Sequence, residues 1–176
     1  MTDKIYNVLF LCTGNSARSV FAECILNHLG EGRFRAFSAG SHPQGKVHPY
    51  ALAELARRHY DTGNLRSKDW SEFEAPGSPT MDFVFTVCDN AAAEVCPVWP
   101  GHPITAHWGL QDPAAESGDD IAKKKVFLQV FRELHHRIST FINLPFESLD
   151  KIRLQQELNR IGRISPAEAA AEEGTT

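Results

Sequence analysis

The sequence predicts an α/β fold, an open four-stranded parallel sheet flanked by helices. Four short apolar segments alternate along the chain with stretches in which apolar residues recur at the spacing of one helix face. The first segment, residues 4–11, is almost continuously apolar, which is typical of a strand covered on both faces. Strands that alternate with helices form parallel sheets, so these observations together predict the class.

The first strand is expected to pass through a tight turn into a helix. The turn contains Gly14 and follows the strand at once. From about Ala17 the apolar spacing becomes helical, and Gly30 stands where such a helix would end. This part of the chain therefore predicts a strand, a short loop and a helix in immediate succession.

The rest of the chain continues the alternation. The expected elements are a strand at 34–39, a helix at 50–60, strands at 81–88 and 104–108, and a long amphipathic helix at 121–141. In the helix at 50–60, the side chains spaced to face inward are those of Leu52, Leu55, Ala56 and His59.

The length of 176 residues suits one domain and is too short for two sizeable ones. We expect the main domain at 1–145 and a helical extension at 146–161. Residues 162–176 are expected to form a disordered tail, because the last twelve residues are rich in Ala, Glu and Gly and contain no large apolar residue.

Composition and charge exclude several classes of function. With 18 basic and 22 acidic side chains, the net charge of −4 does not suit a nucleic-acid-binding face. The longest early apolar run, residues 8–12, is far shorter than the roughly 18 residues that a membrane span needs. We therefore expect a cytoplasmic protein, in which the four cysteines are catalytic, redox-active or metal-binding rather than a disulfide framework.

The most informative segment joins the first strand to the first helix and reads Cys12-Thr13-Gly14-Asn15-Ser16-Ala17-Arg18-Ser19. Backbone amides before a helix N-terminus can bind an anion, and Arg18 can bind two of its oxygens. The same positive field favours a thiolate at Cys12, and Asn15 suits a left-handed backbone position in the loop. The segment predicts a nucleophilic cysteine in an oxyanion-binding loop, against the alternative of a polar turn with a chance cysteine.

Two further cysteines stand at the end of the third expected strand and shortly after it. Cys88 ends that strand, and Cys96 comes eight residues later. If the third strand neighbours the first, a thiol at the shared sheet edge can reach a modified Cys12. Alternatively, Cys88 is a small buried hydrophobe and Cys96 stands in a loop by chance, or the two form a zinc site with His102 and His107, although closely spaced pairs such as Cys-x-x-Cys are absent.

A candidate general acid stands in a late loop. Asp112 precedes Pro113, and a residue before proline is held in an extended conformation. If this loop lies near the strand ends, the Asp112 carboxyl group can protonate a leaving oxygen. An ordinary Asp-Pro turn is the alternative.

Residues 4–143 resemble the low-molecular-weight protein tyrosine phosphatase family, and more narrowly its arsenate reductase branch. The resemblance rests on the loop at 12–19, on Asp112-Pro113, on residues 83–96 and on His107-Trp108-Gly109. The phosphatases typically have apolar residues at the positions of Thr13 and Ser16 and tyrosines after the Asp-Pro. This chain has Ala114-Ala115 there, which suits a small inorganic oxyanion.

The resemblance implies an arsenate reductase in which residues 12–19 bind arsenate or a phosphate-like oxyanion. Cys12 would attack arsenic, Asp112 would protonate the departing oxygen, and Cys88 and Cys96 would carry the disulfide that results. The implied reductant is thioredoxin or a glutaredoxin/glutathione-type system, and no cofactor or metal is required. A protein tyrosine phosphatase or another phosphomonoesterase is the first alternative, and a non-catalytic oxyanion or redox sensor is the second.

Overall fold

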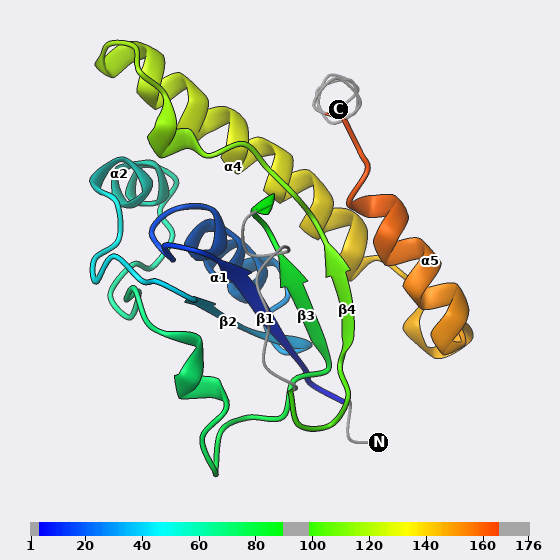
Figure 1. The fold of residues 1–176 in the computed structure, drawn as a ribbon. Coiled ribbons are helices and arrows are strands. Elements are labelled where there is room, and N and C mark those ends of the chain that lie inside the picture. Colours follow the sequence, from blue (N-terminus) through cyan, green and yellow to red (C-terminus); the bar gives the residue numbers. More distant parts are fainter. Residues whose placement is uncertain (1–3, 90–98, 166–176) are drawn as a thin grey trace.

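A computed structural model describes residues 4–89 and 99–165 and shows a parallel sheet packed against helices (Figure 1). The strands are β1 (Tyr6–Cys12), β2 (Phe34–Gly40), β3 (Phe83–Thr86) and β4 (Ile104–His107). The α-helices are α1 (Arg18–Leu29), α2 (Pro49–Arg57), α4 (Asp120–Ile142) and α5 (Lys151–Ile161). Short 3₁₀ turns lie at η1 (Trp70–Phe73), η2 (Pro113–Ala115) and η3 (Phe146–Ser148). The predicted fold class is confirmed.

The strand order is β2-β1-β3-β4, and every neighbouring pair is parallel. The chain therefore runs from β1 to β2 on one side and later returns to β3 on the other side of β1. Such a reversal opens a crevice at the carboxyl end of the central strand. That end is Cys12, where β1 stops and the loop to α1 begins.

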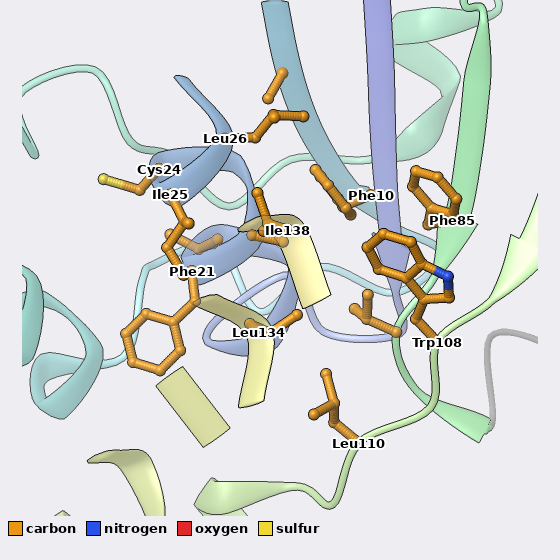
Figure 2. Close-up of a cluster of buried hydrophobic side chains, with 14 of the residues drawn as sticks. Phe10, Phe21, Cys24, Ile25, Leu26, Phe85, Trp108, Leu110, Leu134 and Ile138 are labelled. Atoms are coloured by element: carbon orange, nitrogen blue, oxygen red, sulfur yellow. The ribbon is translucent and has the colours of Figure 1, made fainter. Parts of the chain in front are cut away.

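The sheet has an apolar core on each face because successive side chains of a strand point to opposite sides. Val8 and Phe10 of β1 belong to the larger cluster, on the face covered by α1 and α4, whereas Leu9 and Leu11 belong to the smaller one. Figure 2 shows part of the larger cluster, in which Phe10 and Phe85 from the sheet and Trp108, which follows β4, lie beside residues of α1 and α4. A sheet covered in this way explains the near-continuous apolar character of the first strand.

Helix α5 covers the open edge of β4, as the ribbon view shows (Figure 1). Its buried residues Leu154, Leu158 and Ile161 belong to the larger core cluster. The indole Nε1 of Trp108 donates to the Leu158 carbonyl at 3.0 Å. An edge strand exposes unpaired backbone groups, and at this edge the Gln155 side chain of α5 donates to the Thr105 carbonyl at 2.8 Å.

The second helix ends earlier than predicted. Helix α2 stops at Arg57, so His59 lies beyond its end. Ala56 and His59, which were expected to face inward, are both exposed. His59 adopts a φ of 64°, and the amides of His59 and Tyr60 donate to the carbonyls of Ala56 and Leu55. This is a Schellman ending in which histidine takes the left-handed position that glycine usually occupies. Without a glycine, the ending has no obvious sequence signal.

Other boundaries moved by a few residues. The strand expected at 81–88 is confined to β3, so Cys88 lies two residues beyond its end, and the helix expected from residue 146 begins at Lys151 after the turn η3. Cys96 and residues 166–176 of the expected tail lie outside the described residues, whereas residues 162–165 are described and the Ile164 carbonyl accepts a hydrogen bond from Arg137. Among residues 4–89 and 99–165, no helix is both long and apolar enough to cross a bilayer.

Gly162→Ala is expected to destabilise the protein by about 2 kcal/mol, because overpacking a filled site costs roughly 1–3 kcal/mol. A Cβ at Gly162 would lie 2.5 Å from the His107 carbonyl oxygen and 2.8 Å from the Trp108 ring, where α5 meets β4. Gly63→Ala is the matched control, since the nearest atom to a Cβ at Gly63 would be a carboxylate oxygen of Asp61, 3.3 Å away. Urea unfolding would measure both, and equal stabilities would contradict close docking of α5.

Candidate active site

A cavity of about 220 Å³ opens where β1 passes into α1. Of the predicted oxyanion-binding residues, those that line it are Cys12, Thr13, Gly14, Ser16, Ala17 and Arg18. Asn15 and Ser19 lie beneath the loop and are fully buried. Asp112 and Ala114 close another side of the cavity, so the structure brings the candidate nucleophile, arginine and acid to one place.

The loop turns its carbonyl groups away from the cavity. The amides of His42, Gln44 and His48 donate to the carbonyls of Thr13, Gly14 and Ser16, at 2.9 to 3.0 Å. In a trans peptide the N–H group points opposite to the carbonyl, so the amides that follow these carbonyls face the other side. The Asn15 amide accordingly donates to the Cys12 sulfur at 3.1 Å. By binding these carbonyls, the backbone of residues 41–48 leaves the amides of the loop turned toward the place where an anion would bind.

Asn15 holds the shape of this loop. Its φ of 45° is the left-handed conformation that the sequence predicts for it. The side-chain oxygen accepts the Lys68 amide at 2.8 Å, and the side-chain nitrogen donates to the hydroxyls of Ser19 and Ser38. Both ends of this buried amide are therefore satisfied by partners on three separate segments.

The pKa of Cys12 differs in direction from the sequence prediction of a favoured thiolate. Burial raises the pKa of the Cys12 thiol above its ordinary value, and the Ser19 hydroxyl, 2.9 Å from the sulfur, acts most strongly in the opposite direction. The nearby Cys88 thiol also raises this pKa, whereas the Arg18 charge and the Asn15 amide lower it. The predicted donors are present, but the sequence pattern did not include the burial that outweighs them.

Cys88 lies against the same loop. Its sulfur accepts the Thr13 amide at 3.3 Å, and its side chain is almost fully buried. This contact follows from the pairing of β3 with β1, which places the two strand ends side by side. The structure thus brings Cys88 to Cys12 as expected, whereas Cys96 lies outside the described residues. Cys24 is a buried residue of α1 that does not line the cavity, and burial raises its pKa to about 12.

Arg18 and Asp112 meet at the rim of the cavity. Arg18 donates through Nη1 to the Leu110 carbonyl at 3.0 Å, and its Nη2 lies 3.7 Å from the Asp112 carboxylate. Asp112 is extended, with φ −82° and ψ 109°, and caps η2 by accepting the Ala114 amide. The carboxyl group therefore sits beside the cavity on a turn, where it can meet an oxygen that leaves the loop.

Sequence reasoning missed two kinds of residue. His42 and Gln44 line the cavity because they follow β2 at the same sheet edge, and that position was the one available signal. Glu23 and Lys68 lie behind the loop, with Glu23 accepting a hydrogen bond from Ser38 at 2.8 Å and lying 3.6 Å from the Lys68 ammonium. Burial raises the pKa of Glu23 and lowers that of Lys68.

The zinc alternative finds no support among the described residues, which hold no cluster of three or more His, Cys, Asp or Glu side chains suited to a metal ion. His107, one of the four candidate ligands, instead contacts the Thr86 hydroxyl and the Asp89 carboxylate, at 2.7 and 2.9 Å.

Lys68→Met is expected to destabilise the protein by about 3 kcal/mol at pH 8, because it leaves the Glu23 carboxylate buried without its cation. The pKa of Glu23 is already raised above 4.5 and would rise further. A raised carboxyl pKa gives stability at low pH that is lost as the pH climbs through the folded pKa, so the deficit should be smaller at pH 5. Urea unfolding at both pH values, with the exposed Lys4→Met as control, would test this, and a pH-independent deficit would contradict it.

Known proteins with similar sequences point in one direction. A profile of the family described as low molecular weight phosphotyrosine protein phosphatase matches residues 7–156. A protein named arsenate reductase from Shouchella clausii (strain KSM-K16) is 35% identical over 141 residues, which cover 80% of this chain and 96% of that protein.

Solved structures agree with the sequence relatives. An arsenate reductase in the oxidised state aligns with a TM-score of 0.61 at 28% identity, over 76% of this chain and 93% of that one. The thioredoxin-dependent arsenate reductase of Corynebacterium glutamicum aligns with a TM-score of 0.56 at 25% identity, over 79% of this chain and 61% of that one. A profile match across most of the chain, with relatives above 30% identity, makes this protein a member of the low molecular weight phosphotyrosine protein phosphatase family.

Proposed function

We propose that this protein is an arsenate reductase that uses a cysteine relay. The observation that carries the proposal is the position of Cys88, whose sulfur accepts the Thr13 amide within the loop that begins at Cys12. A phosphoryl transfer through Cys12 needs no second thiol, whereas a reduction does. The relatives named arsenate reductase support the same activity.

The substrate is arsenate, bound as a phosphate-like oxyanion. A cavity of about 220 Å³ accommodates a small tetrahedral ion, and the Arg18 side chain and the loop amides supply donors for its oxygens. The wall at Ala114 offers no aromatic ring to a larger substrate, in keeping with a small inorganic ion. Burial raises the pKa of the Cys12 thiol, and a dianionic substrate can take up the thiol proton as the sulfur attacks.

The first half of the reaction forms a bond between sulfur and arsenic. The Cys12 sulfur attacks the arsenic atom, and an oxygen leaves as water after protonation by Asp112. Arg18 balances the negative charge on the remaining oxygens. Arsenic keeps the oxidation state that it has in arsenate, and it is now bonded to the Cys12 sulfur.

The second half transfers two electrons. The Cys88 sulfur attacks the Cys12 sulfur, the bond between Cys12 and arsenic breaks, and its electron pair leaves with arsenic as arsenite. A disulfide between Cys12 and Cys88 remains. Cys96 then exchanges with it, which regenerates the Cys12 thiol and leaves a disulfide between Cys88 and Cys96 for an external dithiol to reduce.

The proposed reductant is thioredoxin, with a glutaredoxin/glutathione-type system as the alternative. A thioredoxin-dependent arsenate reductase is among the structural relatives, which favours the first. We place the protein in the cytoplasm, where such reductants keep thiols reduced. The catalytic domain is assigned to residues 1–145, followed by the extension at 146–161 and the tail at 162–176, and the reaction requires no metal or organic cofactor.

Phosphatase activity is the second candidate function. Cys12, Arg18 and Asp112 surround one cavity and suffice for hydrolysis of a phosphomonoester, and the family is named for that activity. A non-catalytic sensor would bind an oxyanion without turnover of either substrate. Comparison of arsenite production with aryl phosphate hydrolysis separates the three functions.

Cys12→Ser is expected to lower both arsenate reduction and aryl phosphate hydrolysis by about a thousandfold or more, because it removes the shared nucleophile. Cys88→Ser should stop arsenite release altogether, Cys96→Ser should stop it after the first turnover, and both variants should keep aryl phosphate hydrolysis. Arsenite and phosphate release would be measured in parallel. Cys24→Ala is the control, since Cys24 lies within α1 and does not line the cavity. Loss of aryl phosphate hydrolysis in all three serine variants would contradict the relay.

Arg18→Lys is expected to weaken phosphate binding by about tenfold or more, because an ammonium group cannot reproduce the two-pronged hydrogen bonds of a guanidinium group. Calorimetric titration with phosphate would measure the affinity. Arg35→Lys is the control, because it makes the same substitution at an exposed position of β2 away from the cavity and should bind phosphate as wild type does. Wild-type affinity in Arg18→Lys would mean that the anion is bound elsewhere.

A further inference from the structure

Arg137 of α4 is a buried cation that does not line the cavity. Its side chain is 5% exposed and donates to two backbone carbonyls, through Nη1 to Gly109 and through Nη2 to Ile164, both at 3.2 Å. Burial lowers the pKa of Arg137, and the charge of buried Glu133 acts against this. Burying a charge costs free energy, so a cation kept between two segments suggests a role in their placement.

The Gly109 carbonyl is one residue from a contact of the active site. The next carbonyl, that of Leu110, accepts the hydrogen bond from Arg18 at 3.0 Å. The Leu110 amide donates to Val87, the neighbour of Cys88, at 3.1 Å. Asp112 follows two residues later and lies 3.7 Å from Arg18. A restraint on the Gly109 carbonyl therefore limits the movement of the two groups that Arg18 contacts, the Leu110 carbonyl and the Asp112 carboxylate.

The opposite side of Gly109 is closed. A Cβ at this position would lie 2.7 Å from both the Asp89 carboxylate and the His107 ring. Those two side chains are themselves joined at 2.9 Å. The backbone of Gly109 thus rests against this pair on one side and is held by Arg137 through its carbonyl.

The second partner of Arg137 belongs to the C-terminal segment. Ile164 follows α5, which is anchored to the end of β4 through the hydrogen bond from Trp108 to Leu158. Arg137 therefore bridges two segments that both lead away from the end of β4.

We infer that Arg137 is a positioning residue for the proposed reaction, fixing Gly109 and thereby the Leu110 carbonyl and Asp112 against Arg18, with the C-terminal segment at Ile164 as its second support. The inference rests on the proposed function only in giving Asp112 the role of general acid. Arg137 touches no substrate in this scheme, and it acts through the loop at 109–112.

The test compares kinetics, because a merely structural arginine would change stability alone. Arg137→Met should lower kcat for arsenite production and for hydrolysis of para-nitrophenyl phosphate by about tenfold, at a temperature where it remains folded, since small misplacements of catalytic groups have effects of this size or more. Arg137→Lys keeps the charge but can reach only one carbonyl, so its kcat should be intermediate. Arg132→Met, at an exposed position of the same helix, should match wild type.

A double-mutant cycle shows whether the effect passes through Asp112. Asp112→Asn removes the acid, so adding Arg137→Met to it should lower kcat much less than Arg137→Met does in the wild-type background. Equal losses in the two backgrounds would overturn the inference, as would wild-type kcat in Arg137→Met. If the Met variant does not fold, the same cycle with Arg137→Lys decides, and wild-type kcat in that variant would overturn the inference.

A third measurement does not depend on turnover. Phosphate should protect Cys12 from alkylation by iodoacetamide, followed by mass spectrometry, and Arg137→Met should raise the half-protecting phosphate concentration about fivefold because Arg18 loses its fixed acceptor. If the wild-type protein turns over neither substrate but Arg137→Met still raises the half-protecting phosphate concentration, the proposed function is refuted and the role of Arg137 stands. An unchanged half-protecting concentration would refute that role.

Discussion

The rest of this structure depends on one constraint: the polar loop between β1 and α1 is largely buried, so its backbone and side-chain groups must find hydrogen-bond partners within the protein. At the end of β1 the chain turns through Asn15, which is fully buried and left-handed. Its side-chain amide binds Ser19, Ser38 and the Lys68 backbone, so one residue ties the loop to α1, β2 and the segment before η1. Few side chains tolerate this conformation, and fewer still can satisfy both a donor and an acceptor requirement there. The position of the Cys12 sulfur follows from that turn.

The electrostatics of the site follow from the same burial. Removing Cys12 from water raises its pKa, and the Ser19 hydroxyl, the Arg18 charge and the Asn15 amide lower it again. Behind them, Ser38 connects Asn15 to the buried pair of Glu23 and Lys68. Because low-polarity surroundings strengthen both attraction and desolvation, each member of this network has a large effect on its neighbours. The loop therefore balances a buried thiol against fixed donors.

Local patterns in the sequence predicted the strands, the sheet and most of the loop, because apolar spacing and the step from strand to helix are read over a few residues. The position of Cys88 beside the loop that begins at Cys12 depended on β3 neighbouring β1, which the resemblance to the phosphatase family implied and local patterns did not. They failed where distant segments decide the outcome. His42, Gln44 and Lys68 reach the site through the tertiary fold alone. The burial that raises the pKa of Cys12, like the left-handed His59 that ends α2, has no local pattern.

Two arginines with different surroundings act on neighbouring carbonyls of one short segment. Arg18 begins α1 at the cavity and holds the Leu110 carbonyl, whereas Arg137 lies in the core and holds that of Gly109. Rotation of the peptide between Gly109 and Leu110 would break the hydrogen bond from Arg137 to the Gly109 carbonyl and the one from the Leu110 amide to the Val87 carbonyl, so Arg137 restrains the residue whose own carbonyl Arg18 holds. Since Arg137 also binds Ile164, the packing of α5 on β4 and the geometry around Asp112 become parts of one connected arrangement. On this argument the C-terminal extension belongs physically to the site, although none of its described residues lines the cavity.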